Sequence, residues 1–170
     1  DDELLWVSQS ARYETGVAIR GGIPLCWPWF GASLDNADWP QHGFARTSRF
    51  RRVEERSDAR EMSVILTLDE APAIPAWQGA ASLEVEIRLS DHLWMELRTV
   101  NLSDHDLPVG VGLHNYFRVS DCQTVSVPAL TGLSYLDKPA GFARRTQDSA
   151  LRIEGEIDRI YLQPPHTVEL

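Results

Sequence analysis

Histidine side chains offer the most informative chemistry in this chain of 170 residues, because imidazole can donate or accept a proton near neutral pH. Of the five histidines, three lie in polar surroundings typical of solvated loops: His92, His105 and His166. His42 lies beside a glycine, and His114 lies inside an apolar run, where burial costs free energy unless the ring is hydrogen-bonded. One such histidine usually belongs to a core, but two in glycine- and aromatic-rich segments favour a site.

Other site chemistries find less support in the sequence. It contains no G-x-S-x-G motif of serine hydrolases, no G-x-G-x-x-G and no P-loop. A metal site built from His42 and His114 remains a lesser alternative, because no H-x-H or H-x-x-x-H spacing supports it. Among the carboxylates, which mostly fall on solvated strand faces, Asp158 stands out where charged and apolar residues alternate ahead of Tyr161.

Two segments combine residue types from which carbohydrate sites are built. Residues 20–31 (RGGIPLCWPWFG) hold glycines, prolines and three aromatic residues, and residues 39–46 (WPQHGFAR) place a histidine and an arginine around a glycine. Glycine permits close backbone approach, proline fixes φ, and aromatic rings supply flat apolar walls. A stiff loop that caps the core is the alternative interpretation, and the residues alone leave it open.

The elements that must position these side chains are predicted to be strands, because the hydrophobic pattern has a period of two. Residues 82–89 and 93–101 alternate around a turn at 90–92, which predicts an antiparallel hairpin. Further strands are expected at 62–68, 107–118, 50–55, 124–127 and 151–154. No helical stripe of 12 residues is visible. The predicted fold is all-β, a large antiparallel sandwich in one domain over residues 1–170 with no internal boundary.

Composition bounds the class of protein. Hydrophobic residues make up 43% and charged residues 24%, which are values of globular proteins. A formal net charge of −9 disfavours nucleic-acid binding, and no apolar run reaches the roughly 20 residues that cross a bilayer. The acidic residues 1–3 are unlike a signal peptide. The sequence contains only two cysteines, Cys26 and Cys122, which is typical of proteins with reduced thiols. Together these features predict a cytoplasmic protein without nucleic-acid or membrane partners.

Four blocks in order along the chain carry a resemblance to a known family. They are residues 19–24 (IRGGIP) with 27–31 (WPWFG), 42–46 (HGFAR), 113–117 (LHNYF) and 158–161 (DRIY). Together they resemble the glucose-6-phosphate 1-epimerases, the hexose-6-phosphate mutarotase branch of the aldose 1-epimerase family. The resemblance spans most of the chain and implies a β-sandwich of the galactose-mutarotase type, which agrees with the alternation.

The resemblance also implies an activity and a set of site residues. The activity is interconversion of the α and β anomers of a hexose 6-phosphate, which needs an acid and a base on opposite sides of the acetal. His114 corresponds to the acid, and His42 assists by hydrogen bonding. Asp158 corresponds to the residue that holds sugar hydroxyls, and Arg20 and Arg46 to arginines that receive the phosphate, which the guanidinium fork fits.

Trp29 and Phe30 are expected at the rim of this pocket as substrate contacts. The resemblance implies no cofactor, no metal, and a monomer at full length. Family members are longer than this chain, and their catalytic base is a glutamate in a later block, whereas Glu169 is the sole glutamate after Asp158. We therefore expect a piece of a longer enzyme that lacks both ends. A sugar-phosphate-binding module without the base, or a structural β-sandwich, is the alternative.

Overall fold

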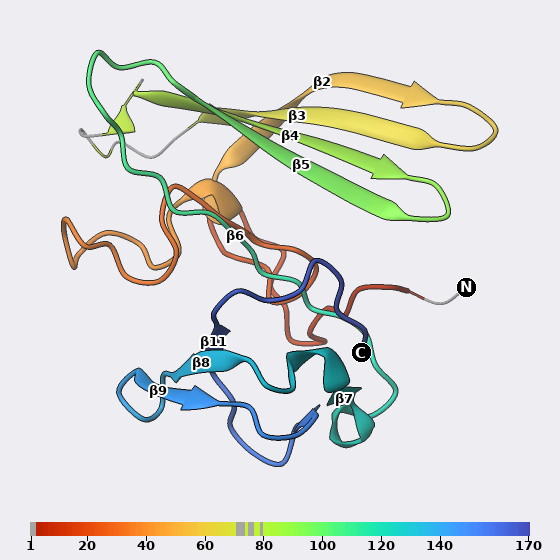
Figure 1. Ribbon diagram of the computed structural model, residues 1–170. Coiled ribbons are helices and arrows are strands. Elements are labelled where there is room, and N and C mark those ends of the chain that lie inside the picture. Colours follow the sequence, from red (N-terminus) through yellow and green to blue (C-terminus); the bar gives the residue numbers. More distant parts are fainter. Residues whose placement is uncertain (1–2, 71–73, 75–76, 79) are drawn as a thin grey trace. The chain divides into compact units, whose positions relative to one another are not determined.

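The chain is all-β, as the period-two pattern predicts. The computed structural model describes residues 3–70, 74, 77–78 and 80–170, and contains no α-helix within those ranges (Figure 1). The strands are β1 (Leu25–Cys26), β2 (Arg49–Ser57), β3 (Met62–Glu70), β4 (Ala81–Leu89), β5 (Leu93–Asn101), β6 (Gly112–Leu113), β7 (Ser126–Val127), β8 (Ser134–Asp137), β9 (Ala143–Thr146), β10 (Leu151–Arg152) and β11 (Arg159–Tyr161). Short 3-10 helices are η1 (Ala45–Thr47), η3 (Cys122–Thr124) and η4 (Pro128–Leu130).

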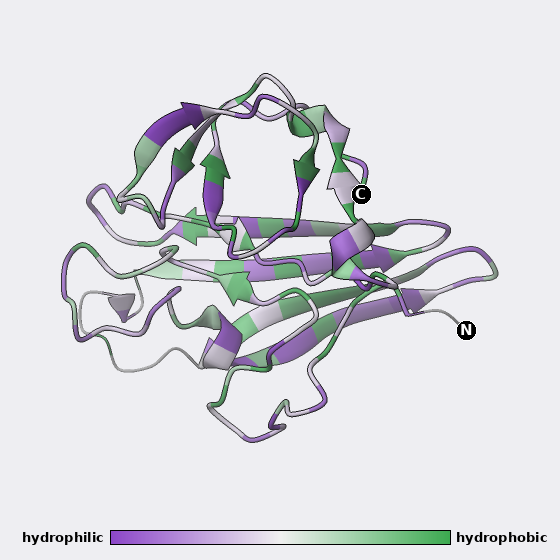
Figure 2. Ribbon diagram, turned by 90° about the horizontal axis from the view of Figure 1, so that it is seen from below, coloured by the Kyte–Doolittle hydropathy of each residue, from purple (hydrophilic) through white to green (hydrophobic). Residues whose placement is uncertain are grey.

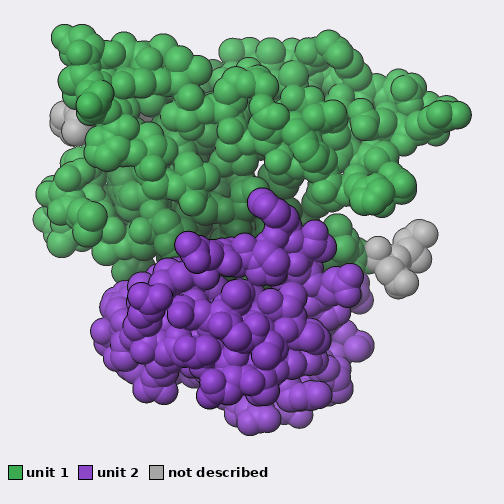
Figure 3. All heavy atoms as spheres, in the orientation of Figure 1, with its two compact units in different colours: residues 1–117 green, residues 118–170 purple. Residues whose placement is uncertain are grey.

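Two compact units divide the chain, residues 1–117 and residues 118–170 (Figure 3). Each unit has its own strand pairs: β1–β6 and the β2–β5 sheet in the first, β7–β10 and the β8, β9, β11 sheet in the second. The expectation of a single domain over residues 1–170 stays a prediction.

A four-stranded antiparallel sheet in the order β2-β3-β4-β5 dominates the first unit. Val64, Ile87 and Met95 are cross-strand neighbours on one face, and one residue along each strand the side chains reverse to the other face. Figure 2 shows the result as alternating hydrophobic and hydrophilic bands along the long strands. The predicted hairpin of residues 82–89 and 93–101 is confirmed, and the predicted strands at 50–55 and 62–68 are each longer than expected.

The predicted strand over residues 107–118 is wrong in extent, because only β6 qualifies. Beyond the β1–β6 pair, N–H groups of this segment still donate to carbonyls of the first block: Gly110 to Pro28 (2.8 Å), His114 to Pro24 (3.1 Å) and Tyr116 to Gly22 (3.0 Å). Proline has no N–H with which to return the bond. Pro24 and Pro28 therefore accept without donating, and the ladder is one-sided outside its two paired residues.

The core of the first unit forms where aromatic rings of the motif blocks meet the apolar face of the sheet. Trp27 and Phe44 lie edge to face at 5.4 Å, and both are almost fully buried with Leu83 and Val85 of β4. The Trp27 indole donates to Thr99 Oγ1 of β5 at 3.0 Å, which satisfies its buried N–H. Burial of the aromatic loop residues thus fixes the loops to the sheet.

The strands of the second unit are all two to four residues long. The predicted strands at 124–127 and 151–154 are present in shortened form as β7 and β10, which pair with each other. The sheet of β11, β8 and β9 was not expected from the sequence, because its strands are only three or four residues long and one of them is fully exposed.

Two glycines with nearly the same backbone conformation give a matched stability test. Gly43 has φ +67° and Gly22 has φ +66°, but a Cβ at Gly43 would lie 2.0 Å from the Trp27 carbonyl oxygen, whereas a Cβ at Gly22 would meet nothing within 4 Å. Both substitutions by alanine carry the left-handed penalty of about 1–2 kcal/mol. We expect Gly43→Ala to lose about 1–3 kcal/mol more in urea unfolding, and equal losses would contradict this packing.

Candidate active site

His114 is positioned by backbone pairing and by a ring stack. Its N–H donates to the Pro24 carbonyl at 3.1 Å, and its side chain is exposed. Tyr116, two residues on and therefore on the same side of the extended segment, places its ring 4.8 Å from the His114 ring. Trp6 stacks on Tyr116 at 5.9 Å. The imidazole is thus oriented by aromatic neighbours while it stays open to solvent.

His42 is positioned by the turn that follows the first block. Its backbone lies in the left-handed region, with φ 65°, and its N–H donates to the Gly31 carbonyl at 2.6 Å. In return the Gly31 N–H donates to His42 Nδ1 at 3.2 Å. A ring nitrogen that accepts a hydrogen bond carries no proton, so the neutral imidazole holds its proton on Nε2. Nε2 of His42 is then a hydrogen-bond donor.

The two histidines come from different blocks and their rings are neighbours, with centroids 6.4 Å apart. Phe30 lies edge to face with His42 at 4.8 Å. The rings form a continuous row: Trp6, Tyr116, His114, His42 and Phe30. Two imidazoles at this spacing can both reach one small polar group, and the apolar rings beside them can contact C–H faces of a sugar.

Phe30 and Trp29 lie in different surroundings, although both were expected at the rim. Phe30 is half exposed beside His42, and Gly112 makes room for it, since a Cβ there would lie 2.6 Å from the Phe30 ring. Trp29 packs against the core and stacks on Trp39 at 5.4 Å. The role of either ring as a sugar contact stays a prediction.

The two arginines assigned to phosphate binding differ in how the protein holds them. Arg46 Nη2 donates to the Gln41 carbonyl at 2.8 Å, while its Nε is buried and has no hydrogen-bond partner among the described residues. A buried donor without an acceptor costs free energy that a ligand oxygen can recover. Arg20 is exposed, and no described side chain pairs with its guanidinium.

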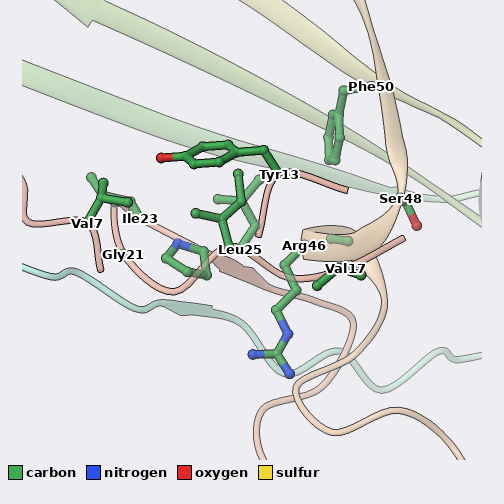
Figure 4. Close-up of a pocket in the computed structure, with 13 residues that line it drawn as sticks. Val7, Tyr13, Val17, Gly21, Ile23, Leu25, Arg46, Ser48 and Phe50 are labelled. Atoms are coloured by element: carbon green, nitrogen blue, oxygen red, sulfur yellow. The ribbon is translucent and has the colours of Figure 1, made fainter. Parts of the chain in front are cut away.

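A pocket of about 440 Å³ opens beside the first block (Figure 4). Its walls are mainly apolar: Val7, Tyr13, Val17, Ile19, Gly21, Gly22, Ile23, Pro24, Leu25, Ala45, Arg46, Ser48 and Phe50. Arg46 is the charged residue among them, and in Figure 4 its guanidinium projects away from Ile23 and Leu25. Neither His42 nor His114 lines this pocket.

Cys26 lies at the centre of the first block and is fully buried. Burial raises the pKa of its thiol, and the positive charge of Arg46 acts in the opposite direction with a smaller effect. The thiol therefore stays protonated and packs as a small apolar group. Cys122, by contrast, is exposed in the second unit.

Asp158 belongs to the second unit. The other residues of its motif block, 158–161, hold the strand β11 in place. The two residues that make the motif specific, Arg159 and Tyr161, both donate to Gln147 Oε1 at 2.7 Å, and Gln147 is buried. This anchors β11 and leaves the Asp158 carboxylate about half exposed, paired with Lys138 at 2.6 Å. The expected convergence of Asp158 with the histidines and arginines stays a prediction.

Sequence reasoning missed the residues that orient the histidines. Tyr116 belongs to a recognised block, but a tyrosine two residues after a histidine gives no signal until the segment is known to be extended. Gly31 acts through its backbone N–H, which no sequence pattern reveals.

The described residues contain neither a cluster of metal ligands nor a membrane-spanning helix. No group of three or more His, Cys, Asp or Glu side chains within those ranges is arranged to hold a metal ion. No helix in the part of the chain that the structure describes is long and apolar enough to cross a membrane. The cytoplasmic location stays a prediction.

Fold and site together define an all-β protein in which aromatic, proline-rich loops bring two histidines side by side. The chain belongs to the aldose 1-epimerase family, whose profile matches residues 1–170. This confirms the family resemblance of the four blocks.

Individual relatives show how much of the family's length is present. A protein of Escherichia coli (strain K12) named "Putative glucose-6-phosphate 1-epimerase" is 31% identical over 166 residues, which cover 96% of this chain and 54% of that protein. A Cenchrus ciliaris protein of the same name is 31% identical over 181 residues, covering 99% and 54%. The chain thus spans about half the length of these curated relatives.

A solved structure supports the fold. The crystal structure of a "putative mutarotase" from Salmonella typhimurium matches with a TM-score of 0.89 and 28% identity, over 99% of this chain and 56% of that one. The expected fold of the galactose-mutarotase type is thereby confirmed.

The tautomer of His42 gives a test of the site geometry. Because Nδ1 accepts from Gly31, we expect neutral His42 to carry its proton on Nε2. Long-range ¹H–¹⁵N correlation spectra of the imidazole rings, recorded above the titration range, measure this directly. His166, which is exposed and has no side-chain hydrogen bond among the described residues, provides the reference ring. A protonated Nδ1 in neutral His42 would contradict the contact with Gly31.

Proposed function

We propose that this chain carries part of the active site of a hexose-6-phosphate 1-epimerase, with glucose 6-phosphate as the substrate. The observation that carries the proposal is the adjacency of His42 and His114, whose ring centroids lie 6.4 Å apart although they come from separate blocks. Membership of the aldose 1-epimerase family supports the reaction type. The names of the curated relatives support the phosphorylated substrate.

His114 acts as the acid in this mechanism. Opening of the pyranose breaks the bond between C1 and the ring oxygen, which leaves as a hydroxyl once it receives a proton. His114 supplies that proton, because its ring is exposed and is oriented by Tyr116. A base removes the O1 proton at the same time, the aldehyde rotates about C1–C2, and the reverse transfers close the ring on its other face.

His42 holds the reacting sugar by donating from Nε2. Its Nδ1 accepts from Gly31, so in the neutral ring Nε2 is the nitrogen that carries the proton. Arg46 receives the phosphate, and its buried Nε is a donor that a phosphate oxygen can satisfy. Arg20, exposed and unpaired with any described side chain, is the second phosphate ligand.

A second candidate function is a sugar-phosphate-binding module that does not catalyse. The engaged Nδ1 of His42 favours it, because His42 and His114 then supply a donor and an acid but no acceptor for the O1 proton. Glu169, the only glutamate after Asp158, is exposed and is assigned no role. The two functions differ in whether a base completes the site.

Removal of Arg46 separates a phosphate ligand from a general sugar ligand. We expect Arg46→Ala to weaken glucose 6-phosphate binding by about 10- to 100-fold, since a charge-assisted hydrogen bond contributes about 1.5–3 kcal/mol. Glucose binding should change little. Isothermal titration with both sugars measures the difference, and Arg52→Ala on the exposed sheet surface is the control. Equal losses for the two sugars would mean that Arg46 only holds Gln41 and its loop.

Loss of the acid should be visible in anomer exchange. In a protein of family length that carries this sequence, we expect His114→Ala to lower kcat for exchange of glucose 6-phosphate anomers by about 10²- to 10⁴-fold. Two-dimensional NMR exchange spectroscopy measures the rate. His92→Ala, an exposed histidine in a hairpin turn, should leave it unchanged. The 170 residues alone should give only the spontaneous rate, and rapid exchange that depends on Glu169 would make that residue the base.

A further inference from the structure

The His114 imidazole is oriented by ring contacts and not by hydrogen bonds. Within the described residues no group hydrogen-bonds to its ring nitrogens, whereas His42 Nδ1 accepts from the Gly31 N–H at 3.2 Å. Its ring neighbours are Tyr116, 4.8 Å away between centroids, and His42, 6.4 Å away. The terminal torsion of a histidine side chain has a broad energy minimum. The direction in which His114 presents its nitrogens therefore depends mainly on Tyr116, the nearer ring.

The Tyr116 ring lies between two other rings. One neighbour is His114, and the other is Trp6, whose indole stacks on Tyr116 at 5.9 Å with an interplanar angle of 27°. The Tyr116 hydroxyl makes no hydrogen bond to a described residue, so no polar contact of the side chain fixes this ring. Removal of the Trp6 indole would open one side of Tyr116 and allow its ring to turn away from His114.

The backbone of Trp6 belongs to a closed ring of three hydrogen bonds. The Trp6 N–H donates to the Tyr116 carbonyl at 2.8 Å, the Tyr116 N–H to the Gly22 carbonyl at 3.0 Å, and the Gly22 N–H to the Trp6 carbonyl at 2.9 Å. Each of the three residues donates once and accepts once. All of them belong to the first unit, together with both histidines.

Close packing holds the segment of residues 5–8 against the first motif block. A Cβ at Gly21 would lie 2.4 Å from Val7 Cα and 2.6 Å from the Trp6 carbonyl oxygen. The Ser8 N–H donates to the Arg20 carbonyl at 2.9 Å. Backbone contacts thus set the position of Trp6. A substitution of its side chain removes the ring contact with Tyr116 and keeps the backbone contacts that hold the segment.

We infer that Trp6 is a positioning residue for His114, the proposed acid, and that it acts through Tyr116. The inference rests on the proposed function and adds to that site a residue from outside the motif blocks. Trp6 limits the rotation of Tyr116, and Tyr116 limits the rotation of His114. The imidazole then keeps the direction in which it gives its proton to the ring oxygen of the sugar, and proton transfer depends on this geometry.

Direct contact between the indole and the sugar is the alternative role of Trp6. Its side chain is 40% exposed, and an aromatic ring that stacked on the substrate would contribute to affinity. A residue that only binds the substrate changes KM when it is removed, whereas a residue that orients the acid changes kcat. The two roles are therefore separated by which kinetic constant responds.

Kinetics of anomer exchange, in a protein of family length that carries this sequence, test the inference. We expect Trp6→Leu to lower kcat for glucose 6-phosphate by about 2- to 10-fold, the range that one aromatic pair supports, with KM unchanged. Trp6→Phe keeps an aromatic face and should retain most of kcat. Trp94→Leu is the matched control, because that indole is 36% exposed and contacts Arg88 on the large sheet. A raised KM with an unchanged kcat would overturn the inference in favour of sugar contact.

Combined substitutions test the route through Tyr116. Tyr116→Leu should lower kcat at least as much as Trp6→Leu does, and the addition of Trp6→Leu to it should have no further effect, because the stack is already broken at its middle ring. Two losses that add in full would overturn the inference. If Trp6→Leu does not fold, Tyr116→Leu alone still tests the stack, since an unchanged kcat in that variant contradicts it.

The His114 ring gives a readout that does not depend on catalysis. In the 170-residue chain, we expect Trp6→Leu to move the Cε1–H resonance of His114 in NMR spectra, because the ring current of Tyr116 acts over a short distance. The resonance of the exposed His166 should stay in place. An unmoved His114 resonance together with an unchanged kcat overturns the inference and leaves the proposed function standing. If the wild-type enzyme of family length does not exchange anomers, the proposed function fails, and the resonance alone decides whether Trp6 orients His114.

Discussion

The backbone carbonyl of Trp27 is the contact on which the arrangement of the first unit depends. It accepts from the N–H groups of Phe44 and Ala45, at 2.9 and 3.2 Å, and Gly43 packs so closely against it that no side chain fits. The Trp27 indole is at the same time tied to Thr99 in the sheet. One residue therefore joins the sheet, the first block and the second block. His42 precedes Gly43, so its position follows directly from this contact.

The prolines of the first block make the second constraint. Because Pro24 and Pro28 accept hydrogen bonds without returning them, residues 110–116 lie along the block without forming a long ladder. The segment is extended, so His114 and Tyr116 lie on the same side of it. Its regular strand pairing, however, stops at Leu113. A continuous strand in the middle of a sheet would be covered on its faces. The interrupted ladder leaves the His114 imidazole exposed, as its proposed role as the acid requires.

The sequence predicted the parts of this structure that depend on local pattern, and missed those that depend on long-range backbone contacts. Alternation over residues 82–101 predicted a hairpin with the observed turn, because nine-residue strands give a strong period-two signal. The predicted strand at 107–118 was too long. A hydropathy pattern carries no information on the N–H groups that Pro24 and Pro28, far away in the chain, lack. The pairing of His42 with His114 was expected from the motif blocks. Its support by Gly31 and Tyr116 was not, because a backbone donor and a ring stack leave no pattern in the sequence.

The distribution of charge bears on the proposed binding of an anionic sugar by an acidic chain. The net charge is −9, but many arginines of the large sheet are matched locally by carboxylates, as in Arg98 with Glu84 and Glu96. Such pairs cancel at short range, and what remains of their field is screened within about 10 Å in physiological salt. Arg20 and the buried Nε of Arg46 are not neutralised by a described carboxylate in this way. In the proposed site their local field, rather than the net charge, acts on a phosphate group at contact distance, and guanidinium keeps its charge at any pH at which the protein is folded.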